Sequence, residues 1–297
     1  MTTLSYDPTH CTLCPRRCGA DRTQAKGRCR MPDAPVVARA ALHHWEEPPL
    51  SGTQGAGTVF FSGCSLGCVF CQNDSISQND FGKAISVARL REIFFELIAT
   101  GAHNIDLVNP THYAHAVAQA LEDPLPVPVV WNSGGYDQVE TLAALEGKIQ
   151  IYLPDYKYTD PDTARRYAGA ADYPETARTA IREMVRQTGP YQLDENGILT
   201  RGVILRHLLL PGGLNQAKEV MDWVAETFPP HTILFSLMSQ YTPWGKAADY
   251  PPLDRRLRKS EIRAAEAYFT NLGLDGFTQG VEAAQAEYIP TFDLTGV

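Results

Sequence analysis

The feature that most constrains this chain is a short loop that carries three cysteines in the spacing CxxxCxxC. These are Cys64, Cys68 and Cys71. The loop follows an apolar run, and its two glycines, Gly63 and Gly67, let the backbone wrap closely around a bulky core. A four-iron cluster needs one outside ligand on each iron, usually a cysteine thiolate. Three thiolates therefore predict a cluster in which one iron stays open.

An aromatic residue, Phe70, precedes the last cysteine of this loop. CxxxCxxC with such an aromatic resembles the signature of the radical S-adenosylmethionine (SAM) enzymes. The resemblance implies that SAM binds the open iron of a [4Fe-4S] cluster and that Phe70 lies near the adenine. It also implies reductive cleavage of SAM to methionine and a 5'-deoxyadenosyl radical, which abstracts hydrogen from a substrate. The alternatives are three structural thiols, or a zinc site completed by a distant histidine.

Composition places the chain among globular proteins. It has 297 residues, 44% of them hydrophobic, and no apolar run approaches the 18 residues of a membrane span. The N-terminus lacks the pattern of an export signal, and seven cysteines in close clusters indicate metal binding in a reducing cytoplasm rather than disulfides. The net charge of -8 disfavours nucleic acid as the main partner.

A second group of cysteines lies near the N-terminus, in the pattern CxxCxxxC with a fourth cysteine ten residues on. These are Cys11, Cys14, Cys18 and Cys29. Four thiolates saturate a structural zinc ion, which is the favoured interpretation, or a second four-iron cluster, and ligand type alone does not separate these two. Free thiols are the third alternative. We expect residues 1–35 to form a cysteine-rich metal-binding segment and residues 36–297 to form the catalytic domain.

Basic residues are interleaved with these cysteines: Arg16, Arg17, Arg22, Lys26, Arg28 and Arg30. A solvated basic face is the favoured interpretation. They would also partly offset the charge of four thiolates, or meet an acidic partner.

Beyond this segment, apolar runs with the character of strands alternate with helical periodicity. The predicted strands are residues 58–62, 104–108, 127–132, 150–153, 203–210 and 232–238. The predicted helices are residues 87–100, 113–121, 138–145, 174–188, 215–227 and 260–272. Alternation of this kind predicts an α/β fold, a partial (β/α)6 barrel of the radical SAM type. Residues 36–45 read as a strand or a short helix, and residues 194–197 as a hairpin turn.

Parallel barrels carry their chemistry at the carboxyl ends of the strands. Asp155 and Lys157 follow the fourth predicted strand and are the predicted catalytic pair, with a surface ion pair as the alternative. The predicted SAM-binding residues, besides Phe70, are Asn109, Thr111, Asn132, Ser133, Arg206 and Gln240. For Arg206 the alternative is a brace inside the barrel.

Two of these motifs carry a closer resemblance. The Asp155-x-Lys157 pair and the Arg206-x4-Pro-Gly run resemble the glycyl-radical activating enzymes, typified by pyruvate formate-lyase activating enzyme. The four N-terminal cysteines and a Glu-Glu-Pro loop are more similar to a pyruvate formate-lyase activating enzyme-like branch of that superfamily. Two positions depart from the pattern: Asn109-Pro110-Thr111 stands in place of Gly-Gly-Glu, and Trp131 in place of an aspartate.

Because of these departures, the substrate does not carry over. A stiff, aromatic segment after the sixth strand, residues 241–252, favours a small-molecule substrate, with four residues expected to narrow the mouth: Trp244, Tyr250, Pro251 and Pro252. The alternatives are a glycyl-radical protein as partner, or a metal-binding interaction module without turnover. A flavodoxin or ferredoxin is the expected electron donor.

Overall fold

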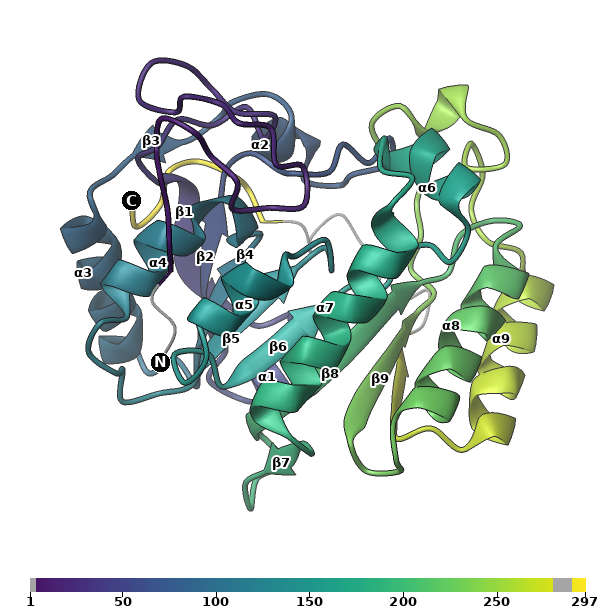
Figure 1. Cartoon of the computed structure of the whole chain (residues 1–297). Helices are drawn as coiled ribbons and strands as arrows, with labels where there is room; N and C mark the ends of the chain where they lie inside the picture. The colour runs from purple at the N-terminus through teal and green to yellow at the C-terminus, as the bar shows by residue number, and fades with distance from the viewer. Residues whose placement is uncertain (1–3, 280–289) are drawn as a thin grey trace.

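A twisted sheet of ten strands forms the centre of the molecule (Figure 1). The computed structural model describes residues 4–279 and 290–297. The strands are β1 (Val36–His43), β2 (Ala56–Phe61), β3 (Lys83–Ala84), β4 (Ile105–Val108), β5 (Val129–Ser133), β6 (Ile151–Pro154), β7 (Gln192–Leu193), β8 (Leu199–Leu208), β9 (Ile233–Met238) and β10 (Gly276–Gln279). Their order is β10-β9-β8-β6-β5-β4-β2-β1-β3, with β7 paired to β8 beside this path.

The six predicted strands correspond to β2, β4, β5, β6, β8 and β9, and each pairs in parallel with the next. Strands in such a sheet are covered on both faces, which explains why they read as continuous apolar runs. All residues of β2, β5 and β6 are buried. The predicted partial barrel is confirmed. The sequence did not predict β10, whose four residues alternate between exposed and half-buried positions and contain no apolar run.

Most of the helices lie along the outside of the curved sheet (Figure 1). The helices are α1 (Pro48–Ser51), α2 (Asp74–Ser77), α3 (Val87–Ala99), α4 (Ala114–Ala120), α5 (Val139–Ala144), α6 (Pro161–Ala168), α7 (Tyr173–Thr188), α8 (Leu214–Thr227) and α9 (Lys259–Leu272). The six predicted helices are present as α3, α4, α5, α7, α8 and α9, and each end lies within one residue of its predicted position. In the two ranges that the structure describes, no helix combines the length and the apolar character needed to cross a membrane.

The ambiguous residues 36–45 form a strand. β1 runs antiparallel to β2 and also pairs with β3. The C-terminal residues reach the same strand, because the amide of Leu294 donates to the carbonyl of Ala38 (3.1 Å) and that of Ala40 donates to Thr295 (2.8 Å). β1 therefore joins the antiparallel end of the sheet to the C-terminus.

The predicted hairpin turn at residues 194–197 is confirmed between β7 and β8. The carboxylate of Asp194 accepts hydrogen bonds from the amides of Asn196 (2.8 Å) and Ile198 (2.9 Å). Gly197 has φ 77°, a left-handed conformation that favours glycine.

The N-terminal segment winds over the sheet near β1, β2 and α2 (Figure 1). Leu13 and Met31 are buried there, and the hydroxyl of Thr141 on α5 donates to the carbonyl of Leu13 (2.8 Å). The segment thus packs onto the barrel, and the division near residue 35 stays a prediction.

Candidate active site

The three cysteines of the CxxxCxxC loop line one cavity of about 310 Å³. All three are free thiols. Burial raises the pKa of Cys64 to about 12, with the neighbouring thiols of Cys68 and Cys71 as further causes. Binding iron would replace their protons, since a metal-bound cysteine is a thiolate. Three free thiols around one cavity fit the ligand set of a four-iron cluster with an open iron.

Each of the three sulfurs lies beside one hydrogen-bond donor. The pairs are Leu66 N with Cys64 Sγ (3.4 Å), the Tyr158 hydroxyl with Cys68 Sγ (3.8 Å) and the Ser77 hydroxyl with Cys71 Sγ (3.4 Å). Hydrogen bonds to ligand sulfurs are one of the means by which proteins set the reduction potential of such clusters. Within residues 4–279 and 290–297, no three His, Cys, Asp or Glu side chains are arranged to hold a single metal ion.

The two loop glycines differ in the space that the structure leaves for a side chain. Gly63 has φ 81°, and a Cβ there would lie 2.6 Å from the carbonyl oxygen of Cys29 and 2.2 Å from the Met31 side chain. At Gly67 a Cβ would meet only the Gln78 side chain, at 3.9 Å. The predicted need for glycine is therefore confirmed at position 63 and wrong at position 67, where the structure leaves room for a side chain.

The structure brings most of the predicted site residues to the same cavity as the cysteines. The predicted residues that line it are Phe70, Asn109, Asn132, Ser133, Asp155, Lys157, Arg206 and Gln240. They meet there because the carboxyl ends of the parallel strands share one edge of the sheet. The structure places Thr111, a predicted SAM-binding residue, elsewhere. It does not line the cavity, because its buried hydroxyl donates to the carboxylate of Asp137 (2.6 Å).

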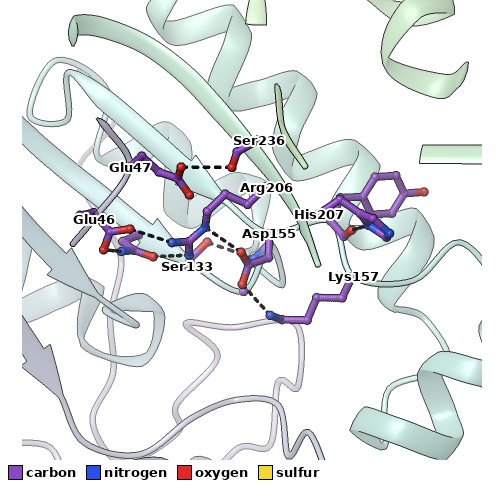
Figure 2. A network of polar contacts seen from close by, with 12 residues as sticks. Glu46, Glu47, Ser133, Asp155, Lys157, Arg206, His207 and Ser236 are labelled. Atoms are coloured by element: carbon purple, nitrogen blue, oxygen red, sulfur yellow. Dashed lines mark hydrogen bonds and ion pairs between the residues drawn. The ribbon is translucent and has the colours of Figure 1, made fainter. Parts of the chain in front are cut away.

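Asp155 and Lys157 form an ion pair at the wall of the cavity, with 2.5 Å between the Lys157 ammonium and Asp155 Oδ2 (Figure 2). Their side chains are only 15% and 22% exposed, so the pair is not a solvated surface contact. Burial alone would raise the pKa of Asp155, but the charges of Arg206 and Lys157 lower it. Asp155 therefore stays ionised.

Arg206 is held by three groups of the protein (Figure 2). Its Nε donates to Asp155 Oδ1 (2.8 Å), and its terminal nitrogens donate to Glu46 (3.0 Å) and to the side-chain oxygen of Asn132 (2.7 Å). Despite its burial, these acidic neighbours raise the pKa of Arg206. The guanidinium braces the interior of the barrel, which was the alternative interpretation, while its side chain still forms part of the cavity wall.

Acidic residues in this network were missed by sequence reasoning. Glu46 and Glu47 lie on the loop before α1, and Asp106 lies within β4. Burial raises the pKa of Glu47 to about 7, against the positive charge of Arg206. Burial and the charge of Glu46 also raise the pKa of Asp106 well above its usual range. The one available signal was Asp106, a carboxylate between Ile105 and Leu107 in an apolar run.

The segment of residues 241–252 covers the cysteine loop. The amide of Lys246 donates to the carbonyl of Val69 (2.7 Å), and the indole of Trp244 donates to Asp74 (3.2 Å). Tyr241 packs edge-on against Phe70, with 5.8 Å between ring centroids, and lines the cavity with Thr242. The four residues expected to narrow the mouth, Trp244, Tyr250, Pro251 and Pro252, are not part of the cavity wall.

The four N-terminal cysteines are also free thiols; Cys11, Cys14 and Cys29 are buried and Cys18 is exposed. The desolvated thiol of Cys14 has its pKa raised to about 12, and the other three cysteines contribute to that shift through their charges. Four neighbouring thiols have the ligand chemistry of zinc and of iron–sulfur clusters, although no three of them are arranged to hold a single metal ion in the part of the chain that the structure describes.

Two of the basic residues in this segment are not on a solvated face. Arg22 is buried, and its terminal nitrogens donate to the carbonyls of His112 and Pro32, both at 2.6 Å. Arg16 donates to the carbonyl of Ser65 in the cysteine loop (2.8 Å). The prediction of a basic face is therefore wrong for these two arginines.

No family model matches the chain. It is 29% identical, over 276 residues, to the Uncharacterized protein MJ0674 of Methanocaldococcus jannaschii, covering 90% of this chain and 76% of that protein.

Among solved structures, SuiB of Streptococcus suis superposes with a TM-score of 0.52 and 14% identity over 78% of this chain and 50% of SuiB. A radical SAM methyltransferase of Sphaerobacter thermophilus superposes with a TM-score of 0.51 and 16% identity, over 76% of this chain and 68% of the methyltransferase. A spore photoproduct lyase superposes with a TM-score of 0.50 and 11% identity, over 77% of this chain and 78% of the lyase. The chain has the fold of radical SAM enzymes. It spans about half the length of SuiB.

Proposed function

We propose that this protein is a radical SAM enzyme that binds a [4Fe-4S] cluster through Cys64, Cys68 and Cys71 and acts on a small-molecule substrate. One observation carries the proposal: the three thiols and the polar residues that follow successive strands line the same cavity. When bound, the cluster supplies the electron that cleaves SAM to methionine and a 5'-deoxyadenosyl radical.

The protein's own residues would bind and orient SAM and keep water out. Phe70 and Tyr241 supply an aromatic wall beside the cysteine loop, suited to the flat face of an adenine. Lys157 places a cation at the cavity, where it would meet the carboxylate of SAM or a charged group of the substrate. Asp155 and Arg206 hold Lys157 and Asn132 in place through direct contacts. These fixed charges would position the reactants without rearranging during the reaction.

The covering segment favours a small substrate over a protein loop. Residues 241–252 are fastened to the cysteine loop through Val69 and to α2 through Asp74. A cavity of about 310 Å³ is at the lower end of the range for small-molecule sites, which is roughly 300–1,000 Å³. Access for a partner's backbone glycine would require this segment to move.

The test is to incubate anaerobically prepared protein with SAM and a strong reductant, alone and with cell extract. Formation of 5'-deoxyadenosine supports an enzyme and contradicts a non-catalytic interaction module. A new small-molecule product in the extract supports the proposed substrate class. A glycyl-radical doublet on a larger protein, detected by EPR spectroscopy, would assign the activating role instead.

A further inference from the structure

The N-terminal cysteine segment differs in charge from the rest of the chain. Residues 10–31 contain six basic residues and one acidic residue, whereas the whole chain has a net charge of -8. Four of the basic side chains are exposed: Arg17, Lys26, Arg28 and Arg30. Two of these cations pair with carboxylates of the barrel, Arg17 with Glu140 (3.4 Å) and Lys26 with Asp80 (2.7 Å). With four exposed cations and two such partners, the segment still presents a net basic surface on an acidic protein.

The thiol of Cys18 is at this surface. Cys18 is exposed and directly follows Arg17. A Cβ at Gly27, between Lys26 and Arg28, would lie 3.7 Å from Cys18 Sγ and 3.4 Å from Cys29 Sγ. The N-terminal thiols thus extend from the basic surface at Cys18 to the buried Cys29.

A hydrogen bond connects Cys29 to the cysteine loop. The backbone amide of Cys64 donates to the carbonyl of Cys29, with 3.3 Å between nitrogen and oxygen. Cys29 is a candidate ligand of the N-terminal site, and Cys64 is a candidate ligand of the site at the cavity. A short path of covalent bonds and one hydrogen bond therefore joins the two sites. It runs from Cys29 Sγ along the Cys29 backbone, across this hydrogen bond, and through the Cys64 backbone to Cys64 Sγ.

Further contacts hold this junction rigidly. Arg16 donates from Nε to the carbonyl of Ser65, the residue after Cys64, and its terminal nitrogens donate to the carbonyls of Gly169 (2.6 Å) and Ala168 (3.1 Å) at the C-terminal end of α6. The close approach of Gly63 to the Cys29 carbonyl leaves no room for a Cβ. The N-terminal segment and the cysteine loop are therefore built as one unit.

We propose that residues 10–31 are the electron-entry site of the protein. An acidic one-electron donor protein docks on the exposed basic side chains, and the four N-terminal thiols hold an iron–sulfur cluster. The donor loses one electron, the N-terminal cluster gains it and passes it on through Cys29 and Cys64, and the [4Fe-4S] cluster at the cavity is reduced. Zinc has no accessible second oxidation state, so the relay requires iron. This inference rests on the proposed function for its final acceptor.

The first test is metal analysis with EPR spectroscopy of the Cys64→Ala/Cys68→Ala/Cys71→Ala variant, prepared without oxygen. Only the N-terminal thiols remain in it as cysteine ligands. Iron with a reducible cluster signal is expected. One zinc per chain and no iron would overturn the relay while leaving the proposed function intact.

The second test is the rate at which a reduced acidic flavodoxin reduces the cavity cluster, followed by stopped-flow absorbance in the absence of SAM. In the Lys26→Gln/Arg28→Gln variant we expect the rate at low salt to fall about tenfold and its salt dependence to weaken, because charge steering is lost. Iron content and reduction by dithionite should be unchanged. The matched control is Lys259→Gln/Arg263→Gln, which removes the same charge from exposed positions on α9 and should react like the wild type.

An unchanged rate with flavodoxin in the Lys26/Arg28 variant would overturn the docking surface. Equal slowing with flavodoxin and dithionite would also contradict it, because that pattern indicates a damaged cluster. Both rates are measured without SAM turnover, so failure of the relay and failure of the proposed enzymatic activity are distinguishable.

Discussion

The two cysteine sites of this protein use the same ligand type for different purposes. The thiols of Cys64, Cys68 and Cys71 face a cavity that polar residues from several strand ends line together with apolar side chains. The N-terminal thiols number four, which saturates a site, and they lie among arginines at the surface of the barrel. An incomplete ligand set beside a cavity indicates chemistry, and a complete set indicates structure or electron transfer.

The largest expected effect separates the sites completely. Changing Cys64, Cys68 and Cys71 together to Ala should abolish SAM cleavage and the EPR signal that SAM perturbs, because no other three thiols line the described cavity. The converse variant, with Ala at Cys11, Cys14, Cys18 and Cys29, should retain that signal after chemical reduction. Retention of the SAM-perturbed signal in the first variant would contradict the assignment of the open site.

The next effect concerns the charged wall of the cavity. Lys157→Met and Asp155→Asn should each lower the rate of 5'-deoxyadenosine formation by about tenfold or more, since a positioning charge near the reacting centre is lost. Iron content should not change, because neither residue is a cysteine of the loop. Full activity in both variants would show that this ion pair is only a structural contact.

A smaller effect is expected from the donors to the sulfurs. Tyr158→Phe and Ser77→Ala each remove one hydroxyl from a ligand sulfur. At a fixed potential, the ratio of reduced to oxidised cluster should fall roughly fivefold, which corresponds to about 1 kcal/mol for one hydrogen bond. Tyr167→Phe is the control, because Tyr167 packs against Tyr158 with 6.2 Å between ring centroids, and its hydroxyl makes no hydrogen bond to a sulfur within the described residues. A redox titration by EPR spectroscopy that finds equal potentials would contradict this role.

The last effect is on stability rather than on the reaction, and it comes from Glu47, a buried carboxyl group that does not itself line the cavity. The pKa of Glu47 is raised to about 7 by burial and by Glu46, and lowered by Arg206 and by hydrogen bonds from Ser236 and Gln279. A carboxyl group whose pKa is higher in the folded than in the unfolded state stabilises the fold while protonated, so this contribution is lost as pH rises from about 4.5 to about 7. The loss amounts to roughly 3 kcal/mol.

Glu47→Gln should therefore remove part of the pH dependence of the free energy of unfolding, and make the protein more stable than the wild type at pH 8. Denaturant unfolding at pH 5 and pH 8 measures this. Equal pH dependence in both proteins would contradict the raised pKa.

The sequence predicted the parallel barrel well because its strands are buried on both faces and read as unbroken apolar runs, as in Ile151–Pro154. It was ambiguous for residues 36–45, since apolar periodicity alone does not separate a short helix from a strand. That segment is a strand because it pairs with β2, β3 and the C-terminal residues. These pairings come from tertiary contacts.

The candidate site was predictable where spacing carried the signal, as for the cysteines and for Asp155 and Lys157. The contact of Arg206 with Glu46 was not, because Glu46 lies 160 residues away and precedes two prolines in what reads as a solvated loop. Thr111 follows a strand end like its predicted neighbours, yet its hydroxyl turns to Asp137. Side-chain direction at a strand end depends on such contacts, which local sequence does not reveal.

The most direct test of the central claim is a single-turnover assay. Anaerobically reconstituted protein is reduced with dithionite, mixed with SAM and analysed for 5'-deoxyadenosine and methionine, beside the Cys64→Ala/Cys68→Ala/Cys71→Ala variant. We expect both products in equal amounts from the wild type and neither from the variant. A reduced, fully iron-loaded wild-type protein that leaves SAM intact, even with cell extract as a source of substrate, would contradict the claim that this cavity cleaves SAM.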